Sequence, residues 1–367
     1  MKKVAFVASV GIHIKSFHLP YLEYFKNEGY KTYALTKDGC KYPNCDESIK
    51  IPFERSPFSK STFKAYKELK KVIDKENFDI IHCHTPVAAF LTRLAARKAR
   101  KNGTRVIYTA HGFHFSKEAP LLNWLIYFPI EWFASFFTDC IITLNKEDYN
   151  RAKKHLKAKS IYHVHGVGVD TDRFSDVVES KSEILKELNL PENTKILFSV
   201  GELNKNKNHQ VILKAMAKIN DDNLYYLIAG NGVQEKKLCE LSKELGIEKK
   251  VKLLGYRTDI NRLLNAVDIF CFPSHREGLP VSVMEAMASG LPVIASNIRG
   301  NTDLIDSGEG GFLCSPKSPS QFRESVKILL EDESLKEKFG QYNKEKIKIF
   351  SLKNVKEEMI KIYTIYM

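Results

Sequence analysis

Residues 269–296, IFCFPSHREGLPVSVMEAMASGLPVIAS, decide the fold of this chain. The apolar, β-prone start of the segment, Ile269–Phe272, predicts a strand that Pro273 ends. A polar loop with Glu277 and Gly278 follows. The segment therefore begins as a strand that runs into a loop of polar residues.

A short helix is expected after this loop. Ser282 is placed as its N-cap, and Glu285 three residues later completes a capping-box pattern. Gly290 is expected to end the helix because Pro292 forbids its continuation. The apolar run that begins at Val293 predicts the next strand.

The expected start of this helix is suited to an anion. The first backbone N–H groups of a helix are unpaired, and the helix dipole favours negative charge there. Two carboxylates, Glu277 and Glu285, are a poor choice for holding phosphate. They suit sugar hydroxyls, because ionised carboxylates only accept hydrogen bonds and hydroxyls donate them. The segment therefore predicts a nucleotide-sugar site.

Length and composition favour a globular protein of two domains. The chain has 367 residues, and its hydrophobic share of 43% is ample for packed cores. The net charge of +13 suits nucleic acid, an anionic membrane surface or phosphorylated small molecules as partners. The chain has no zinc-finger spacing and no RNP-like aromatic pattern, so nucleic acid is not expected as a partner.

The cysteines and the apolar runs indicate a cytoplasmic protein. Seven scattered cysteines without a CxxC pair predict free thiols in a reducing compartment. The run Val4–Val10 is too short for a secretory signal and is typical of a first strand. The longest apolar stretch, 121–137, is broken by Asn123, Pro129 and Glu131. A membrane-spanning helix needs about 20 apolar residues, so none is expected.

Strands and helices alternate through the first half. The expected strands are 4–10, 31–36, 79–82, 105–109 and 139–144, and the expected helices are 19–27, 61–76, 88–101 and 121–137. Gly11–Ser16 is expected to be a loop, and Ser61 is expected to cap its helix. This alternation predicts a parallel sheet with helices on both faces.

The second half repeats the alternation. The expected strands are 196–200, 225–229 and 251–254, and the expected helices are 209–218, 234–245, 260–266, 318–331, 333–349 and 354–366. Loop-like and polar sequence near residue 172 places the boundary between a domain of residues 1–172 and one of residues 173–351. The expected fold class is α/β, with two doubly wound Rossmann-like domains facing across a cleft that binds ligands.

Residues 273–296 closely resemble the signature of family 4 retaining glycosyltransferases, which have the GT-B fold. Further matching motifs cover most of the chain: Gly11, His82–Pro86, Thr109–Phe113, Gly166–Asp170, Val200–Gly201, Ala229–Gly232 and Gly255–Arg257. The runs HGFHF from His111 and GELNKNKNH from Gly201 look most like the branch that builds bacterial capsule, exopolysaccharide and O-antigen units. The resemblance implies that residues 352–367 cross back to the first domain.

The resemblance implies catalytic roles for three residues. Glu277 would contact hydroxyls of the donor sugar, and His111 would reach across the cleft to that sugar. Lys207 would neutralise the leaving diphosphate. Glu285 would hold the ribose hydroxyls. Family members retain the anomeric configuration, by front-face attack assisted by the leaving phosphate. No metal and no other cofactor is expected, since helix N–H groups and a lysine can neutralise the charge.

The other donor-binding positions that the resemblance implies are Gly11, Gly201, Lys205, Gly230, Tyr256, Arg257, Gly278, Leu279 and Val281. The backbone N–H groups of the last three would cradle the β-phosphate. Gly11 has no Cβ and would let its loop approach the diphosphate closely. One position departs from the family, because Glu202 stands where the family's usual Arg would. Lys205 is the candidate to supply the missing charge.

Three patterns have simpler interpretations. His82 and His84 point the same way on a strand, but a buried strand end is favoured over a metal site because no third ligand is evident nearby. Asp170-Thr171-Asp172 matches the Asp-x-Asp metal signature of other glycosyltransferases and is interpreted as linker. Lys207 lies among polar residues, so a solvated turn competes with the functional interpretation.

The lysine-rich helix 61–76 and the aromatic region 121–137 predict peripheral association with an anionic membrane surface. The alternative is a solvated lysine face and an aromatic core. The whole chain then predicts a retaining, metal-independent hexosyltransferase on the inner face of the plasma membrane. It would move a sugar from a nucleotide-sugar, by expectation a UDP-sugar, to a lipid-linked saccharide acceptor in cell-surface polysaccharide synthesis. The rivals are a UDP-sugar epimerase or hydrolase on the same fold and a non-catalytic sugar-nucleotide-binding protein.

Overall fold

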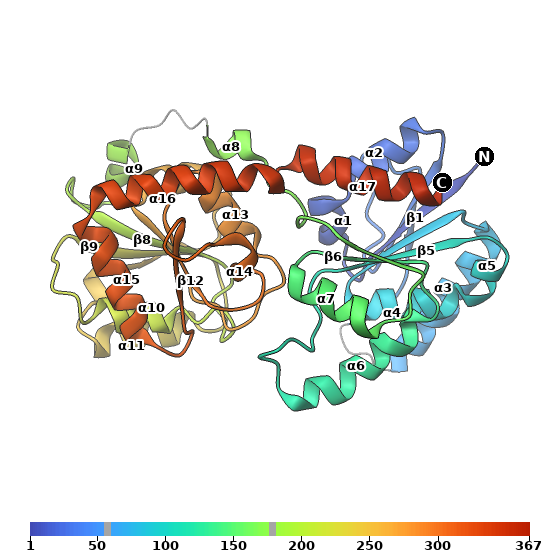
Figure 1. Cartoon of the computed structure of the whole chain (residues 1–367), viewed down its shortest axis with the longest axis horizontal. Helices are drawn as coiled ribbons and strands as arrows, with labels where there is room; N and C mark the ends of the chain where they lie inside the picture. Colours follow the sequence, from blue (N-terminus) through green and yellow to red (C-terminus); the bar gives the residue numbers. More distant parts are fainter. Residues whose placement is uncertain (55–59, 176–180) are drawn as a thin grey trace. The chain divides into compact units, whose positions relative to one another are not determined.

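The computed structural model describes residues 1–54, 60–175 and 181–367, which form two compact units (Figure 1). Unit 1 comprises Met1–Val167 with Val355–Met367, and unit 2 comprises Gly168–Asn354. Each unit has one parallel sheet covered by helices. The predicted α/β class with two doubly wound domains is confirmed.

The sheet of unit 1 has seven strands in the order β3-β2-β1-β4-β5-β6-β7. They are β1 (Lys3–Val7), β2 (Lys31–Thr36), β3 (Glu47–Lys50), β4 (Ile80–His84), β5 (Arg105–Ala110), β6 (Cys140–Thr143) and β7 (Ser160–His163). Every residue of β4 is buried, as expected of a central parallel strand with both faces covered. The strand order reverses between β1 and β4, where open α/β sheets bind ligands beyond the carboxyl ends of the strands.

The helices of unit 1 are α1 (Gly11–Phe17), α2 (Leu19–Asn27), α3 (Lys60–Glu76), α4 (Pro86–Ala95), α5 (Arg97–Lys101), α6 (Leu121–Ser135), α7 (Lys146–His155) and most of α17 (Leu352–Tyr366). Three predictions here are wrong. Gly11–Ser16 is helical rather than a loop, and buried Ile14 anchors it. Ser61 lies inside α3, so it cannot be the N-cap. The expected helix 88–101 is two helices, which meet at Ala96 with a ψ of −1°.

The sheet of unit 2 has six strands in the order β10-β9-β8-β11-β12-β13. They are β8 (Lys195–Val200), β9 (Leu224–Ala229), β10 (Val251–Leu253), β11 (Ile269–Phe272), β12 (Val293–Ser296) and β13 (Gly311–Cys314). The order reverses between β8 and β11. The short strands β3, β7 and β13 were not predicted. Each lies at an edge of its sheet and none is buried along its whole length, so they lack the continuous buried apolar run of a central strand.

The helices of unit 2 are α8 (Thr171–Ser175), α9 (Lys181–Glu187), α10 (Gln210–Met216), α11 (Glu235–Glu244), α12 (Ile260–Ala266), α13 (Val281–Ala288), α14 (Asn301–Leu304), α15 (Pro319–Glu331) and α16 (Glu333–Lys346). Two single turns, η1 (Glu248–Lys250) and η2 (Ile347–Phe350), are 3₁₀ helices. The linker interpretation of Asp170-Thr171-Asp172 holds only for Asp170, since Thr171 and Asp172 are the first two residues of α8. Asp170 Oδ1 accepts a hydrogen bond of 3.2 Å from the backbone N–H of Arg173.

The deciding segment folds into β11, α13 and β12, as predicted. Its capping differs from the prediction. The N-cap of α13 is Pro280, whose side chain makes no capping hydrogen bond. Ser282 is the second helical residue, so the capping box of Ser282 and Glu285 does not form. The expected end is confirmed, because Gly290 follows the C-cap Ser289 with a φ of +75°.

The helix α6 is apolar around most of its circumference, and it continues through Pro129. Across the described parts of the chain, no helix is long and apolar enough to cross a membrane. The inner side of α6 carries Glu131, which makes a two-pronged ion pair with fully buried Arg93 at 2.9 and 3.0 Å. This bidentate pair fixes α6 against α4.

Candidate functional site

Lys207 and Glu277 meet where the strand order of unit 2 reverses. Lys207 lies in the loop after β8, and Glu277 lies in the loop after β11. Lys207 Nζ is 2.9 Å from Glu277 Oε1, and the two side chains are only 20% and 16% exposed. Lys207 Nζ also lies 4.6 Å from the centre of the Phe272 ring. The interpretation of Lys207 as part of a solvated turn is therefore wrong.

Three asparagines shape the loop that carries Lys207. Asn204 Oδ1 accepts a 2.9 Å hydrogen bond from the backbone N–H of Lys207. Asn206 Nδ2 donates to the carbonyl of Arg276 at 2.9 Å, and Asn208 Nδ2 donates to that of Pro273 at 3.0 Å. These bonds tie the loop after β8 to the loop after β11. No role was predicted for these asparagines, although their regular alternation with lysine in the sequence could have indicated a structured loop.

Arg299 supports Glu277 from another direction. Its Nε donates to the backbone carbonyl of Glu277 at 3.0 Å, and the side chain is almost fully buried. The next residue, Gly300, has a φ of +82°, and a Cβ there would overlap the carbonyl oxygen of Gly278. The backbone that leads from Glu277 into α13 is therefore held from two sides. Arg299 was also missed, because nothing in its local sequence distinguishes it from a surface arginine.

The N-terminus of α13 follows this backbone. Gly278 and Leu279 lead to the N-cap Pro280, and Val281 is the first helical residue. The N-cap Pro280 has no side chain that could bond the first N–H groups of the helix, so these groups and the helix dipole can act on an anion. Lys207 is paired with Glu277 at the same loop. Unit 2 thus combines a cation, a carboxylate and a helix N-terminus at one strand end.

Glu285 is the fifth residue of α13. Burial raises the pKa of its carboxyl to about 7, against a smaller opposing effect of Arg173. The carboxyl is therefore partly protonated at neutral pH. Ribose hydroxyls that donate hydrogen bonds would favour its ionised form.

Two glycines keep the ends of β8 and β9 free of side chains. A Cβ on Gly230 would overlap the carbonyl oxygen of Gly201, and one on Gly201 would press on Lys207 Cε at 3.0 Å. The Gly230 N–H donates to the carbonyl of Gly255 at 2.7 Å, at the end of the next strand. The three strand ends therefore lie close together and expose backbone rather than side chains.

Three other predicted donor-binding residues have different surroundings. Lys205 is exposed and lines a separate cavity of about 250 Å³ together with His275. The Arg257 guanidinium is held by Glu187 at 2.8 Å and by Asp259 at 2.6 Å, which raises its pKa. Tyr256 is 77% exposed. The structure pairs Arg257 with carboxylates other than Glu277 and places Lys205 at another cavity, so their assignment stays a prediction.

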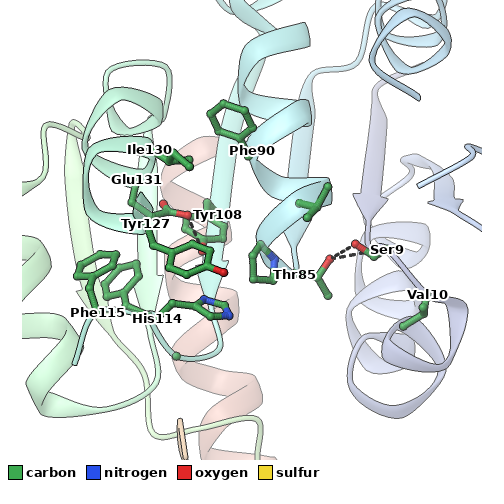
Figure 2. Close-up of a pocket in the computed structure, with 14 residues that line it drawn as sticks. Ser9, Val10, Thr85, Phe90, Tyr108, His114, Phe115, Tyr127, Ile130 and Glu131 are labelled. Carbon is green, nitrogen blue, oxygen red and sulfur yellow. Dashed lines mark hydrogen bonds between the residues drawn. The ribbon is translucent and has the colours of Figure 1, made fainter. Parts of the chain in front are cut away.

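Unit 1 has an apolar pocket of about 560 Å³ at its own point of strand reversal (Figure 2). Ser9 and Val10 follow β1, and Thr85 follows β4. Figure 2 shows Tyr127 and Ile130 of α6 across the pocket from them. The volume is within the range of about 300–1,000 Å³ that is usual for small-molecule sites.

Four histidines cluster beside this pocket. The ring nitrogens of His13, His18, His84 and His111 lie within 4.8 Å of one another. His13 Nε2 is 3.1 Å from His111 Nε2. Burial lowers the pKa of His13 to about 4, and it lowers the pKa of the other three well below the usual value. All four imidazoles are therefore neutral at pH 7.

The statement that His84 has no third ligand nearby is wrong, since three histidines from other segments surround it. Four neutral imidazoles are a donor set that a transition metal such as zinc accepts. His82 does not share this arrangement. Its Nδ1 is 2.8 Å from Tyr363 Oη of α17, and its Nε2 is 2.8 Å from Thr109 Oγ1. Local packing also explains why residue 11 is a glycine, because the side chains of Asp38 and Tyr42 occupy the space that a Cβ at this position would fill.

Comparison with known proteins gives the family. Residues 22–173 match the model "Glycosyltransferase Family 4", and residues 180–346 match "Glycosyl transferases group 1". The "Putative glycosyltransferase EpsD" of Bacillus subtilis (strain 168) is 41% identical over 370 residues, which cover 100% of this chain and 97% of that protein. The chain belongs to glycosyltransferase family 4.

The chain is also similar to a galactosyltransferase in sequence and to a solved structure in fold. The Escherichia coli UDP-Gal:alpha-D-GlcNAc-diphosphoundecaprenol alpha-1,3-galactosyltransferase is 32% identical over 273 residues, which cover 73% of this chain and 70% of that protein. The crystal structure of Anabaena HepE in complex with UDP has a TM-score of 0.81 at 17% identity, and it covers 99% of this chain and 100% of that one. At this identity the second likeness shows the fold, which is GT-B.

Glu202, which stands where the family's usual Arg would, has a structural partner in this family 4 glycosyltransferase. Glu202 is exposed, and its Oε2 accepts a 3.0 Å hydrogen bond from Asn204 Nδ2. Asn204 also holds the backbone of Lys207. Glu202 therefore supports the loop that presents Lys207.

Proposed function

We propose that the enzyme transfers a sugar from a nucleotide-sugar, a UDP-sugar, to a lipid-linked saccharide in cell-surface polysaccharide synthesis. The observation that carries the proposal is the grouping of Lys207, Glu277 and the uncapped N-terminus of α13 at one strand end. The printed name of the E. coli relative gives UDP-Gal as donor and a diphosphoundecaprenol-linked sugar as acceptor. A Campylobacter jejuni relative, 26% identical and covering 91% of each chain, is named for a diphospho-undecaprenol acceptor.

Unit 2 has groups that can stabilise the negative charge that develops on the leaving diphosphate. The bond between the anomeric carbon and the phosphate oxygen breaks, and the electron pair leaves with the diphosphate. The N-terminal N–H groups of α13 and the Lys207 ammonium stabilise this negative charge. Fixed donors of this kind supply the largest catalytic contribution without a metal.

The two glutamates orient the donor. Glu277 accepts hydrogen bonds from hydroxyls of the sugar, and Glu285 accepts them from the ribose. The acceptor hydroxyl attacks on the face from which the diphosphate leaves, so the new bond to the anomeric carbon retains the configuration. The hydroxyl proton passes to a phosphate oxygen. His111, neutral at pH 7, contributes a hydrogen bond to the sugar rather than a charge.

A screen of nucleotide-sugars with purified protein and membrane extract tests this function. Sugar label in the lipid fraction supports transfer. An altered free nucleotide-sugar without transfer would favour an epimerase or hydrolase, and binding without any turnover would favour a sugar-nucleotide-binding protein. Glu277→Gln keeps the size of the side chain and should abolish transfer, and near-normal turnover would remove Glu277 from the site.

We also propose that unit 1 associates with the inner face of the plasma membrane. The exposed side of α6 presents large apolar side chains, which are Leu121, Leu122, Leu125, Trp132 and Phe133. The exposed side of α3 presents Phe63 with Lys64, Lys67 and Lys71. α4 contacts both helices. Apolar and cationic groups on one unit suit an anionic lipid surface.

A further inference from the structure

The apolar pocket of unit 1 has one polar end and one apolar end. Ser9 and Thr85 bond through their hydroxyls at 2.8 Å, and His114 lies at the same end (Figure 2). The helix α4 begins there after its N-cap Thr85, whose side chain makes no capping hydrogen bond. Phe90 and Ile130 lie toward the other end of the pocket in Figure 2. An elongated ligand with a polar head and an apolar tail matches this gradient.

The pocket wall carries no unbalanced charge among its described residues. Glu131 is the one carboxylate in the described lining, which includes no lysine or arginine, and Arg93 neutralises this carboxylate from behind. The Arg93 guanidinium also lies 4.1 Å from the centre of the Tyr108 ring, so that ring separates it from the pocket space. The apolar part of the lining, which includes Val87, Phe90 and Ile130, offers a sugar no side-chain hydrogen bond, whereas a hydrocarbon chain needs none there.

The helix that walls the pocket is also the one that is apolar on its outer side. Tyr127 and Ile130 face the pocket, while Leu122 and Leu125 are exposed. Further along α6, Lys154 and Lys157 line a groove with Trp132. A chain that leaves the pocket past α6 would therefore pass directly into an apolar surface rimmed by cations.

We propose that this pocket holds the isoprenoid segment next to the phosphate of the lipid-linked acceptor. The diphosphate would lie at the Ser9, Thr85 and α4 end, within reach of the His111 side of the unit. The rest of the polyprenyl chain would pass α6 into the membrane. The inference rests on the proposed function for its acceptor, and it adds that the enzyme recognises the lipid as well as the saccharide.

The test measures binding rather than transfer, by calorimetry of the full-length enzyme. The probes are inorganic diphosphate and its geranyl, farnesyl and geranylgeranyl esters. We expect affinity to rise by about tenfold or more per isoprene unit until the pocket is full, and then to level off. Equal affinity for inorganic diphosphate and the farnesyl ester would overturn the proposal without use of any variant.

Ile130→Trp fills the apolar end and should weaken farnesyl diphosphate binding at least tenfold. Ile328→Trp makes the same substitution at an exposed position of α15 in unit 2 and is the matched control. Circular dichroism of both variants reports whether they fold. Unchanged binding in folded Ile130→Trp would overturn the assignment of the pocket.

Transfer assays separate this proposal from the proposed function. If the wild-type enzyme glycosylates a soluble saccharide as well as an isoprenyl-linked one, and Ile130→Trp does the same, the function stands and the pocket assignment falls. If farnesyl diphosphate binds in the pocket but no sugar is transferred to any acceptor, the pocket assignment stands and the function falls.

Discussion

Lys207 Nζ lies 2.9 Å from Glu277 Oε1, although the two residues are 70 positions apart in the chain. The cation proposed for the leaving diphosphate and the carboxylate proposed for the sugar thus form an ion pair with each other. The pair keeps both mostly buried charges compensated until a donor arrives. A nucleotide-sugar would exchange this pair for one contact to its diphosphate and one to its sugar.

Loss of the cation should therefore act mainly on turnover. We expect Lys207→Met to lower kcat by about 10²–10³, the usual effect of removing one donor that stabilises developing negative charge. Lys214→Met, at an exposed position of the otherwise mostly buried α10, is the matched control and should leave kcat unchanged. If kcat stays unchanged and only KM rises, Lys207 binds the donor in the ground state and does not stabilise the leaving group in the transition state.

Nucleotide binding should depend on pH through Glu285. The ligand-free carboxyl has a pKa of about 7, and hydroxyl donors favour its ionised form, so binding lowers that pKa and releases a proton. Affinity for UDP should accordingly rise from pH 6 toward pH 7 and level off above it. Calorimetry in buffers of different ionisation enthalpy measures the proton directly. Glu285→Gln should bind more weakly and lose this part of the pH dependence, and an identical profile in the variant would exclude the residue.

The close approach of β8 and β9 predicts a stability effect at Gly230. Gly230→Ala would press its Cβ on the Gly201 carbonyl, which adds an overpacking cost of about 1–3 kcal/mol to the backbone strain. Gly246→Ala is the control, because that glycine also has a positive φ but open space around it, and it should cost only about 1–2 kcal/mol. Thermal unfolding compares them. Equal melting temperatures in the two variants would contradict the crowding argument.

Association with lipid should need both the apolar and the cationic side chains of unit 1. We expect the enzyme to pellet with vesicles that contain phosphatidylglycerol at low salt, and to do so less at high salt because screening weakens charge attraction. Replacing Leu121, Leu122 and Leu125 by Ser should release it even at low salt. The single replacement Val233→Ser, at an exposed apolar residue of unit 2, serves as the control. Absence of wild-type protein from the low-salt pellet would end the membrane proposal.

The reaction should not require a metal, since Lys207 and α13 supply the charge stabilisation. Treatment with dipicolinate is expected to leave the transfer rate unchanged. The histidine cluster in unit 1 makes this a stringent test, because its four neutral rings could ligate zinc. Loss of activity on chelation and its return with zinc would assign that cluster a metal and contradict the prediction.

The sequence alone determined the fold class and most of the elements that carry the site. The pattern of apolar runs is local, so it predicted β11, α13 and β12, and the Glu277 and Glu285 motif pointed to the family that the comparisons confirm. Capping was less predictable. Ser282 fits a cap by spacing, yet the chain enters α13 through Pro280, because the loop before it is fixed by Arg299 from a distant strand end.

Only the tertiary structure decided which distant residues act together. The order of strands in a parallel sheet places the ends of β8 and β11 side by side, and this brings Lys207 to Glu277. The same kind of reversal in unit 1 gathers His13, His84 and His111 from three segments beside the apolar pocket. Local periodicity carries no information on strand order, which long-range packing and hydrogen bonding select. The residue types needed for the chemistry could therefore be predicted from the sequence. Which of these residues lie next to one another was decided by the strand order.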